Sequence, residues 1–327
     1  MGVLDCVPPN KMMPTESTEV FAIDAYTISG SRRDLESQSH TKSSGRTHSI
    51  WWNVFIDLPL LAVVLTVLGL YEFRVIPSHK AGFFCQDPKL NYTLNGDTVS
   101  GAALVSSALL LPIAFILITE VFLLDSEYLV RSRTTEALRR TALLFRAYSY
   151  GFCFNFIIVE VMKGITGMPR PVFFDQCAPD TNVDCIPGEY VSTFECTSSN
   201  SWWAQYDSYH SFPSGHTSLS VYCGLFIAWY LQRRAFSWSG RTVLLVPFLQ
   251  LCCASYAALC SLSRITDHRH HWWDVLVGAV VGVLTMLFAV LVICDNFSIV
   301  REREDASRIP KSTTNLLYGT QRARPSS

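Results

Sequence analysis

Apolar residues gather in six runs along the chain, and polar segments separate these runs. Each run has about the 20 residues that an α-helix needs to cross the hydrocarbon core of a bilayer. The third run contains Arg146 and Glu160 near its ends, so a buried helix at the membrane surface is the alternative there. The six runs lie at 51–71, 101–124, 141–162, 215–232, 242–262 and 275–294.

This pattern predicts an all-α membrane protein with six transmembrane helices in one domain at 50–295. The polar segments 1–49 and 296–327 predict disordered cytosolic tails. Composition agrees, because charged residues make up 16% of the chain, against roughly 25% in soluble domains. The net charge of −1 and the lack of a long basic run argue against a nucleic-acid partner.

Lysine and arginine are unevenly distributed between the polar segments, and this distribution predicts the orientation. The two tails and the segments 125–140 and 233–241 contain eighteen of these residues, whereas the other three connecting segments contain seven. Positive residues accumulate on the cytosolic side of a membrane protein. We therefore expect both tails in the cytosol and the other connecting segments outside the cell or in a lumen, with the plasma membrane favoured over internal membranes.

Four cysteines lie in the segments expected outside, where an oxidising compartment permits disulfide bonds. Four cysteines allow three pairings, and the sequence does not choose among them. The first of these outer segments also contains an N-glycosylation sequon at Asn91, so we expect a glycoprotein. The four cysteines are Cys85, Cys177, Cys185 and Cys196.

Three polar motifs stand where apolar runs begin or end. KGITGMPRP (Lys163–Pro171) follows the third run, FPSGHTS (Phe212–Ser218) opens the fourth, and SRITDHRHHWWD (Ser263–Asp274) joins the fifth to the sixth. Because successive spans cross the membrane in alternate directions, all three motifs are predicted to converge at its outer edge. Ionisable groups in such a place are costly and mark functional sites.

The cations of these motifs predict a phosphate-binding site. Arg170 and Arg264 offer forks of N–H donors that fit tetrahedral oxyanions, and Lys163 adds a point charge. Ser214 and Gly215 begin the fourth run. The free N–H groups and the dipole at the start of a helix also favour an anion.

Two histidines and an aspartate supply the remaining chemistry. If the sixth helix begins a few residues early, His270 and Asp274 lie one turn apart on the same face. A carboxylate bonded to one ring nitrogen fixes the tautomer and leaves the other nitrogen free to attack phosphorus. His216 can then protonate the departing oxygen. Together these groups predict a phosphomonoesterase that needs no metal and no other cofactor.

A metal site is the alternative interpretation of the third motif. Asp267, His268, His270 and His271 are residue types that suit zinc. Three cations directed at the same place would repel a metal ion, so the sequence favours the metal-free interpretation.

The motifs resemble those of the lipid phosphate phosphatases, the type 2 phosphatidate phosphatases, whose pattern is K-x6-RP, PSGH and SR-x5-H-x3-D. The motif order and the six-span layout agree over roughly residues 50–295, and GFFCQDP and HHWWDVLVG look animal-type. The sequon departs from the pattern, because family members usually have it between the first two motifs. Every fixed motif position is filled, by Lys163, Arg170, Pro171, Pro213, Ser214, Gly215, His216, Ser263, Arg264, His270 and Asp274.

The resemblance implies a helical bundle with an outward-facing site, in a superfamily shared with the vanadium haloperoxidases. It implies that His270 attacks phosphorus to form a phosphohistidine, that Asp274 supports it, and that His216 protonates the leaving group. The implied substrates are phosphatidate, lysophosphatidate, sphingosine 1-phosphate and ceramide 1-phosphate, and a homo-oligomer is compatible with the family. The residues implied to hold the phosphoryl oxygens are Lys163, Arg170, Ser214, Gly215 and Arg264.

Other functions stay open from the sequence. A non-catalytic relative would bind lipid phosphates and signal through its tails, but such relatives lose motif residues and none is lost here. A transporter is disfavoured because the chain shows neither an internal repeat nor paired interrupted spans. A phosphatase or phosphotransferase for another phosphorylated substrate is the remaining alternative, since the motifs recognise only phosphate.

Overall fold

The computed structural model describes residues 78–123, 130–182, 184–236 and 243–298, together with seven positions between 59 and 70. Most of the predicted first span, the whole predicted N-terminal tail and most of the predicted C-terminal tail lie outside these residues. The chain divides into two compact units, Met1–Leu61 and Ala62–Ser327, and every element described below belongs to the second unit.

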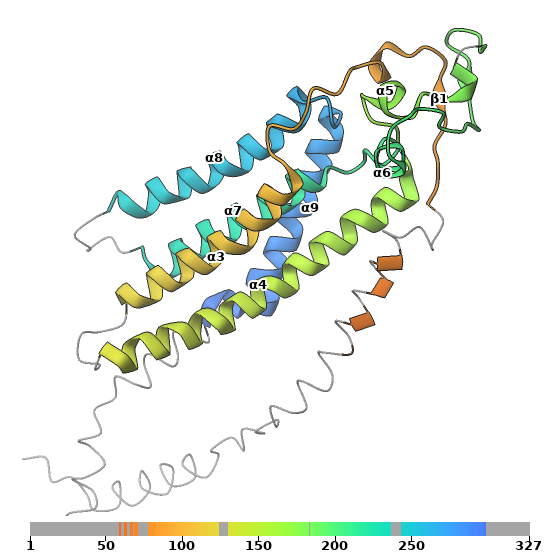
Figure 1. Ribbon diagram of the computed structural model, residues 1–327. Coiled ribbons are helices and arrows are strands. Elements are labelled where there is room, and N and C mark those ends of the chain that lie inside the picture. Colours follow the sequence, from red (N-terminus) through yellow and green to blue (C-terminus); the bar gives the residue numbers. More distant parts are fainter. Residues whose placement is uncertain are drawn as a thin grey trace, which may run out of the picture. The chain divides into compact units, whose positions relative to one another are not determined.

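Helices dominate the described residues (Figure 1). Four helical segments are long and apolar enough to cross a membrane, at Gly101–Leu123, Arg133–Thr166, Leu245–Thr266 and Trp272–Ile293. They correspond to the predicted second, third, fifth and sixth spans, so the third run is a helix of spanning length. The long helices are α3 (Gly101–Leu123), α4 (Val130–Thr166), α7 (Gly215–Arg234), α8 (Leu245–Thr266) and α9 (Trp272–Phe288), which continues through η3 (Ala289–Ile293) and η4 (Asp295–Phe297).

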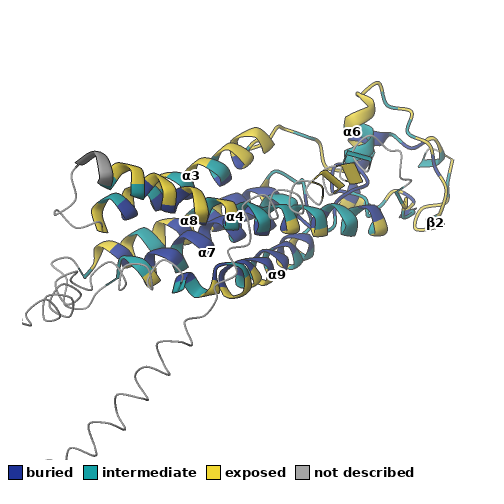
Figure 2. Cartoon of the chain, turned by 90° about the horizontal axis from the view of Figure 1, so that it is seen from below, coloured by how far each residue is buried: buried dark blue, intermediate teal, exposed yellow. Residues whose placement is uncertain are grey.

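The predicted fourth span does form a helix, α7, but it is not among the four apolar segments. The reason is its position, because α7 packs against α3, α4, α8 and α9 and is largely buried by them (Figure 2). A helix enclosed by other helices can carry polar side chains if they find partners. Ser218 donates to Asn155 at 2.9 Å, and Ser220 donates to the carbonyl of Thr217 at 3.2 Å.

A buried carboxylate joins three of the helices near one end of the bundle. Glu120 of α3 is fully buried and forms ion pairs with Arg140 of α4 at 3.4 Å and Arg234 of α7 at 3.1 Å. Tyr230 donates to the same carboxylate at 3.0 Å. Buried charges persist when they are paired in this way, so Glu120 has a structural role.

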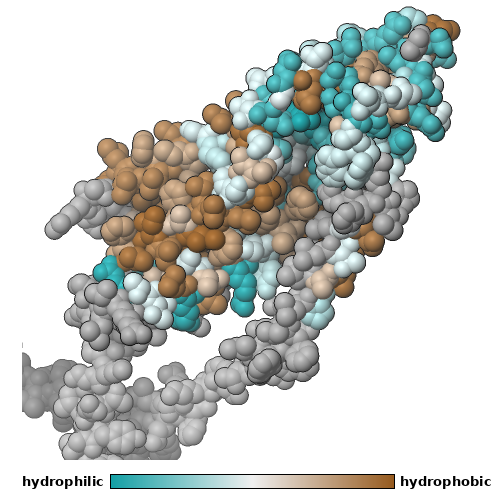
Figure 3. Space-filling view, viewed as in Figure 1, coloured by the Kyte–Doolittle hydropathy of each residue, from teal (hydrophilic) through white to brown (hydrophobic). Residues whose placement is uncertain are grey.

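The opposite end of the bundle is covered by a cap, which we define as residues 78–100 and 167–211. The cap contains β1 (Phe83–Phe84) paired antiparallel with β2 (Tyr190–Val191), the short helices α5 (Phe173–Cys177) and α6 (Trp202–Asp207), and the turns η1 (Pro88–Leu90) and η2 (Asp180–Asn182). Disulfide bonds Cys85–Cys185 and Cys177–Cys196 link its loops. Hydrophilic residues gather at this end, whereas hydrophobic residues cover the helices (Figure 3).

A close contact fixes the start of α9 against the start of α7. A side chain at Gly278 would begin only 2.5 Å from the carbonyl oxygen of Ser214, so only glycine fits there. The amide of Ser214 donates to the carbonyl of Asp274 at 3.0 Å. The second and third motifs are thereby held together.

Candidate active site

The three motifs meet around a cavity of about 310 Å³ at the cap end of the bundle. Its walls come from α3, α4, α6, α7 and α8 and from the segments that precede α3, α5 and α9. The structure brings six of the predicted site residues to this cavity, namely Lys163, Arg170, Gly215, His216, Arg264 and His270.

The first motif enters the cavity from the end of α4. Lys163 lies in the last turn, where its Nζ is 2.8 Å from Glu160 Oε1. After α4 the chain turns at Gly167, which has a φ of +56° and would place any Cβ 1.9 Å from the carbonyl oxygen of His79. Only glycine permits this turn, which leads the chain to Arg170.

Arg170 is buried, and its guanidinium is held by the cap. Its Nη2 donates to Asp207 Oδ1 at 2.5 Å, and its Nε donates to the carbonyl of Asp207 at 2.7 Å. Longer hydrogen bonds of 3.3 Å reach the carbonyls of His210 and Arg269. Although burial acts to raise it, the charge of Arg170 holds the pKa of Asp207 below its usual value.

The third motif contributes two arginines, of which the sequence analysis assigned only Arg264. Arg264 is buried and donates to Asp97 at 3.1 Å and to Asp267 at 2.8 Å. Arg269 donates two hydrogen bonds of 2.8 Å to the same Asp97 carboxylate, and its Nη1 lies 3.6 Å from Asp207 Oδ2. The cavity therefore contains a fourth cation.

The second motif begins α7, with Ser214 as the N-cap. The Ser214 hydroxyl oxygen accepts a hydrogen bond from the amide of Thr217 at 3.4 Å. Ser214 is fully buried and does not line the cavity, whereas Gly215 and His216 do. The Ser214 side chain has a capping role, which orients the first N–H groups of α7, and the phosphate contact of Ser214 stays a prediction.

His216 has a buried Nε2 without a hydrogen-bond partner in the described part of the chain. Such an atom is costly to leave unpaired. Because His216 lines the cavity, a ligand there can supply the missing partner.

His270 precedes α9, and its ring is held by a carbonyl. Nδ1 lies 2.7 Å from the carbonyl oxygen of Ser211. A carbonyl only accepts, so Nδ1 carries the proton and Nε2 keeps the lone pair. Burial first, and then the charge of Arg170, lower the pKa of His270 to about 4, so its ring is neutral near pH 7.

The structure places Asp274 beside His270, as predicted, but not within hydrogen-bonding distance. Asp274 Oδ2 is 3.7 Å from His270 Nδ1, which is longer than a hydrogen bond. Helix α9 begins only at Trp272, so His270 lies outside it, and Asp274 caps the helix through the amide of His271 at 2.9 Å. Asp274 also accepts a hydrogen bond from the Ser211 hydroxyl at 2.5 Å. Because the carbonyl of Ser211 contacts the His270 ring, Asp274 positions His270 through Ser211.

The supporting motif residues frame the site without lining it. Pro171 and Pro213 are buried, and the Ser263 hydroxyl bonds the carbonyl of Cys260 at 3.0 Å. Asn91 is exposed on the cap, at the end of η1.

The described residues do not form the ligand set that the alternative interpretation of the third motif, a metal site, would need. Among the residues that the structure describes, no three His, Cys, Asp or Glu side chains could hold a metal ion. His268 stacks on Tyr92 with 4.1 Å between ring centroids, and His271 stacks on Trp273 at 4.6 Å. The rings of His268 and His271 therefore stack on other aromatic side chains and do not join His270 in a ligand set.

Sequence reasoning missed four residues that shape the site, Asp97, Asp207, Ser211 and Arg269. Arg269 stands inside the third motif, and its charge at a membrane edge was a usable signal. The two aspartates lie in polar cap segments, where nothing in their spacing distinguishes them from other loop residues. Ser211 acts mainly through its backbone carbonyl, which has no sequence signature.

Comparison with known proteins places the chain in a family. The family model of the PAP2 superfamily matches residues 144–298. The chain is 30% identical to phospholipid phosphatase 2 of Bos taurus over 276 residues, which is 81% of this chain and 93% of that protein. It is 29% identical to phospholipid phosphatase 1 of Rattus norvegicus over 269 residues, 78% of this chain and 93% of that protein. No solved structure matches the chain.

The helical fold, the apolar helices and the motif-lined cavity define an integral membrane phosphatase of the PAP2 type. The chain belongs to the phospholipid phosphatase family within that superfamily.

Proposed function

We propose that the protein hydrolyses phosphomonoesters of membrane lipids, with phosphatidate, lysophosphatidate, sphingosine 1-phosphate and ceramide 1-phosphate as substrates. The names of its relatives support a lipid substrate. The observation that carries the chemistry is the His270 ring, neutral and held through Nδ1, in a cavity with four cations.

In the proposed reaction, Nε2 of His270 attacks phosphorus, and the bond from phosphorus to the lipid oxygen breaks. The negative charge of the bound phosphate favours the protonated form of His216, which gives its proton to the departing oxygen. His216 then takes a proton from water, whose oxygen attacks the phosphohistidine and releases inorganic phosphate and His270. Lys163, Arg170, Arg264 and the N-terminus of α7 hold the phosphoryl oxygens, and no metal takes part.

The proposal includes a topology. It has six transmembrane helices, both tails in the cytosol and the cavity on the outer side of the plasma membrane. Among the described helices, α7 packs between α3, α4, α8 and α9. Two disulfide bonds in the cap, on the same side as the cavity, support this orientation, because disulfides persist in an oxidising compartment. A homo-oligomer is compatible with this arrangement.

The test is phosphate release from phosphatidate and sphingosine 1-phosphate in mixed micelles that contain EDTA. Wild type should release phosphate, and His270→Ala should release almost none while remaining folded. His268→Ala is the matched control, because this ring stacks on Tyr92 in the cap and does not line the cavity. Turnover by His270→Ala equal to that of wild type would refute the mechanism.

A further inference from the structure

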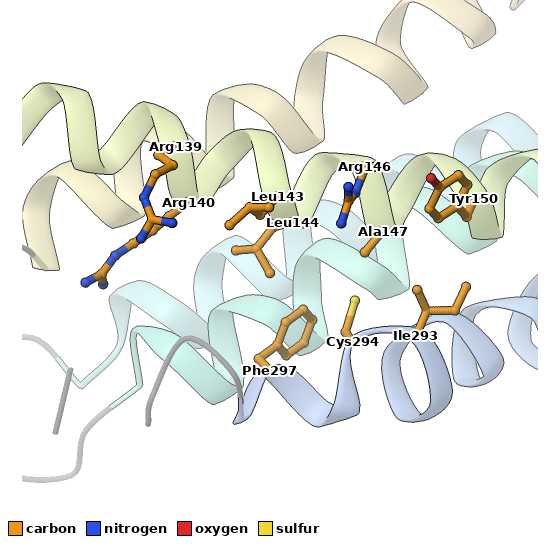
Figure 4. Close-up of a pocket in the computed structure, with 10 residues that line it drawn as sticks. All are labelled: Arg139, Arg140, Leu143, Leu144, Arg146, Ala147, Tyr150, Ile293, Cys294 and Phe297. Atoms are coloured by element: carbon orange, nitrogen blue, oxygen red, sulfur yellow. The ribbon is translucent and has the colours of Figure 1, made fainter. Parts of the chain in front are cut away.

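A second cavity, of about 280 Å³, lies between α4 and the segment after α9 (Figure 4). Leu143, Leu144 and Ala147 of α4 face Ile293 and Phe297 across it. Arg139, Arg140 and Arg146 add three guanidinium groups to these apolar walls. The helical stretch from Arg146 to Lys163 is about 25 Å long, so this cavity is remote from the catalytic one.

The three arginines differ in their partners. Arg139 makes two hydrogen bonds of 2.8 Å with Glu136, and Arg140 pairs with Glu136 at 3.0 Å and with Glu120 at 3.4 Å. Arg146 has no hydrogen bond or ion pair with any residue that the structure describes, and its side chain is exposed. Within the described residues, the cavity thus carries a positive charge that no carboxylate balances.

This charge stands within the stretch of α4 that is apolar enough to cross a membrane. An unpaired cation at such a position is costly, and ionisable residues within membrane spans face the bundle interior or a water-filled cavity, where they pair with other polar groups. A guanidinium matches the geometry of a phosphate group with two parallel hydrogen bonds. Basic pockets between membrane helices bind the headgroups of anionic lipids.

We propose that this cavity binds an anionic phospholipid from the bilayer leaflet at that end of the bundle. Its phosphate pairs with Arg146, with Arg139 as the neighbouring donor, and an acyl chain lies against Leu143 and Ile293. The ligand is bound and not hydrolysed, because no histidine is among the described residues that line the cavity.

The test uses the full-length, delipidated protein in detergent and native mass spectrometry with dioleoylphosphatidylglycerol. This lipid is a phosphodiester, so a phosphomonoesterase does not consume it, and its binding is scored independently of the proposed activity. Arg146→Gln removes the charge, and Ala147→Phe fills the cavity without a change of charge. Lys89→Gln, which removes an exposed cation of the cap, is the control.

We expect Arg146→Gln and Ala147→Phe each to raise the Kd of phosphatidylglycerol at least about tenfold, with Lys89→Gln within about twofold of wild type. Unfolding temperatures close to that of wild type would show that the variants are folded. Equal affinity of Arg146→Gln and wild type would overturn the proposal. Wild type that prefers phosphatidylglycerol no more than phosphatidylcholine would also overturn it, since another part of the chain would then fill the cavity.

Discussion

Arg269 and Asp97, which are 172 positions apart in the chain, form a two-pronged ion pair with both hydrogen bonds at 2.8 Å. Arg264 donates to the same carboxylate at 3.1 Å. Within the described residues, the other cations of the cavity have carboxylate neighbours too, Glu160 for Lys163 and Asp207 for Arg170. A phosphate that enters the cavity must therefore compete with protein carboxylates for its cations.

Replacement of Asp97 should strengthen the binding of free anions. In Asp97→Asn, both arginines lose a charged competitor, so the inhibition constant of inorganic phosphate should fall by about tenfold. Inhibition of lipid phosphate hydrolysis at increasing phosphate concentrations measures this constant. Asp184→Asn in the exposed part of the cap is the control and should leave the constant unchanged. A constant that stays the same or rises in Asp97→Asn would show that Asp97 does not compete with phosphate.

Substitution of Arg170 by lysine should impair the enzyme although the charge is kept. One guanidinium reaches both the carboxylate and the carbonyl of Asp207, and an ammonium group cannot reproduce this fork. We expect kcat/KM to fall at least about a hundredfold, which is the usual effect of losing one preorganised donor. The control is Arg233→Lys at the far end of α7. Similar kinetics of the two variants would contradict the role of Arg170 as a fork.

Helix positions could be predicted from the sequence because hydrophobic length is a strong local signal. The run at 101–124 and helix α3 agree to within one residue. Helix α4 extends well beyond the run at 141–162, because Glu136 pairs with arginines one turn later and stabilises a polar first segment. Helix α7 can carry polar side chains because other helices enclose it. This position depends on tertiary packing and could not be predicted from the local sequence.

The residues of the candidate site that belong to the three short motifs could be predicted from the sequence. Lys163, Arg170, Gly215, His216, Arg264 and His270 all line the cavity, as their convergence on one face requires. The network of Asp97, Asp207 and Arg269 depends on how the cap folds over the bundle, which no local pattern encodes. The contact between Ser211 and His270 is made by a backbone carbonyl, so residue types say nothing about it.

Stability should fall as the pH is lowered. Burial lowers the pKa of both His210 and His270 from 6.5 to about 4. Between these values the unfolded chain binds protons that the folded protein does not, so the free energy of unfolding decreases as pH falls through this window. Each ring contributes about 3 kcal/mol at most. The unfolding temperature, measured from pH 7 to 4.5, should decline less steeply in His210→Gln than in wild type. Equal slopes would show that His210 is not buried in its neutral form.

Ser211→Ala tests whether Asp274 acts on His270 through Ser211. The substitution keeps the carbonyl but removes its hydroxyl link to Asp274, so the His270 ring should be less well positioned. We expect kcat to fall by roughly tenfold to a hundredfold with little change in KM. Ser208→Ala is a matched control, because this buried hydroxyl donates to the carbonyl of Gln205 in α6 and, among the described residues, has no link to Asp274. An unchanged kcat in Ser211→Ala would mean that Asp274 orients His270 directly.

The central claim, that His270 is the nucleophile, is tested most directly by trapping the phosphoenzyme. Radiolabelled phosphatidate is mixed briefly with the protein and quenched in alkali, under which a phosphohistidine survives, and the labelled peptide is sequenced. We predict label on His270 in wild type and none in His270→Ala. Label on another residue, or label of the same amount in His270→Ala, would contradict the account.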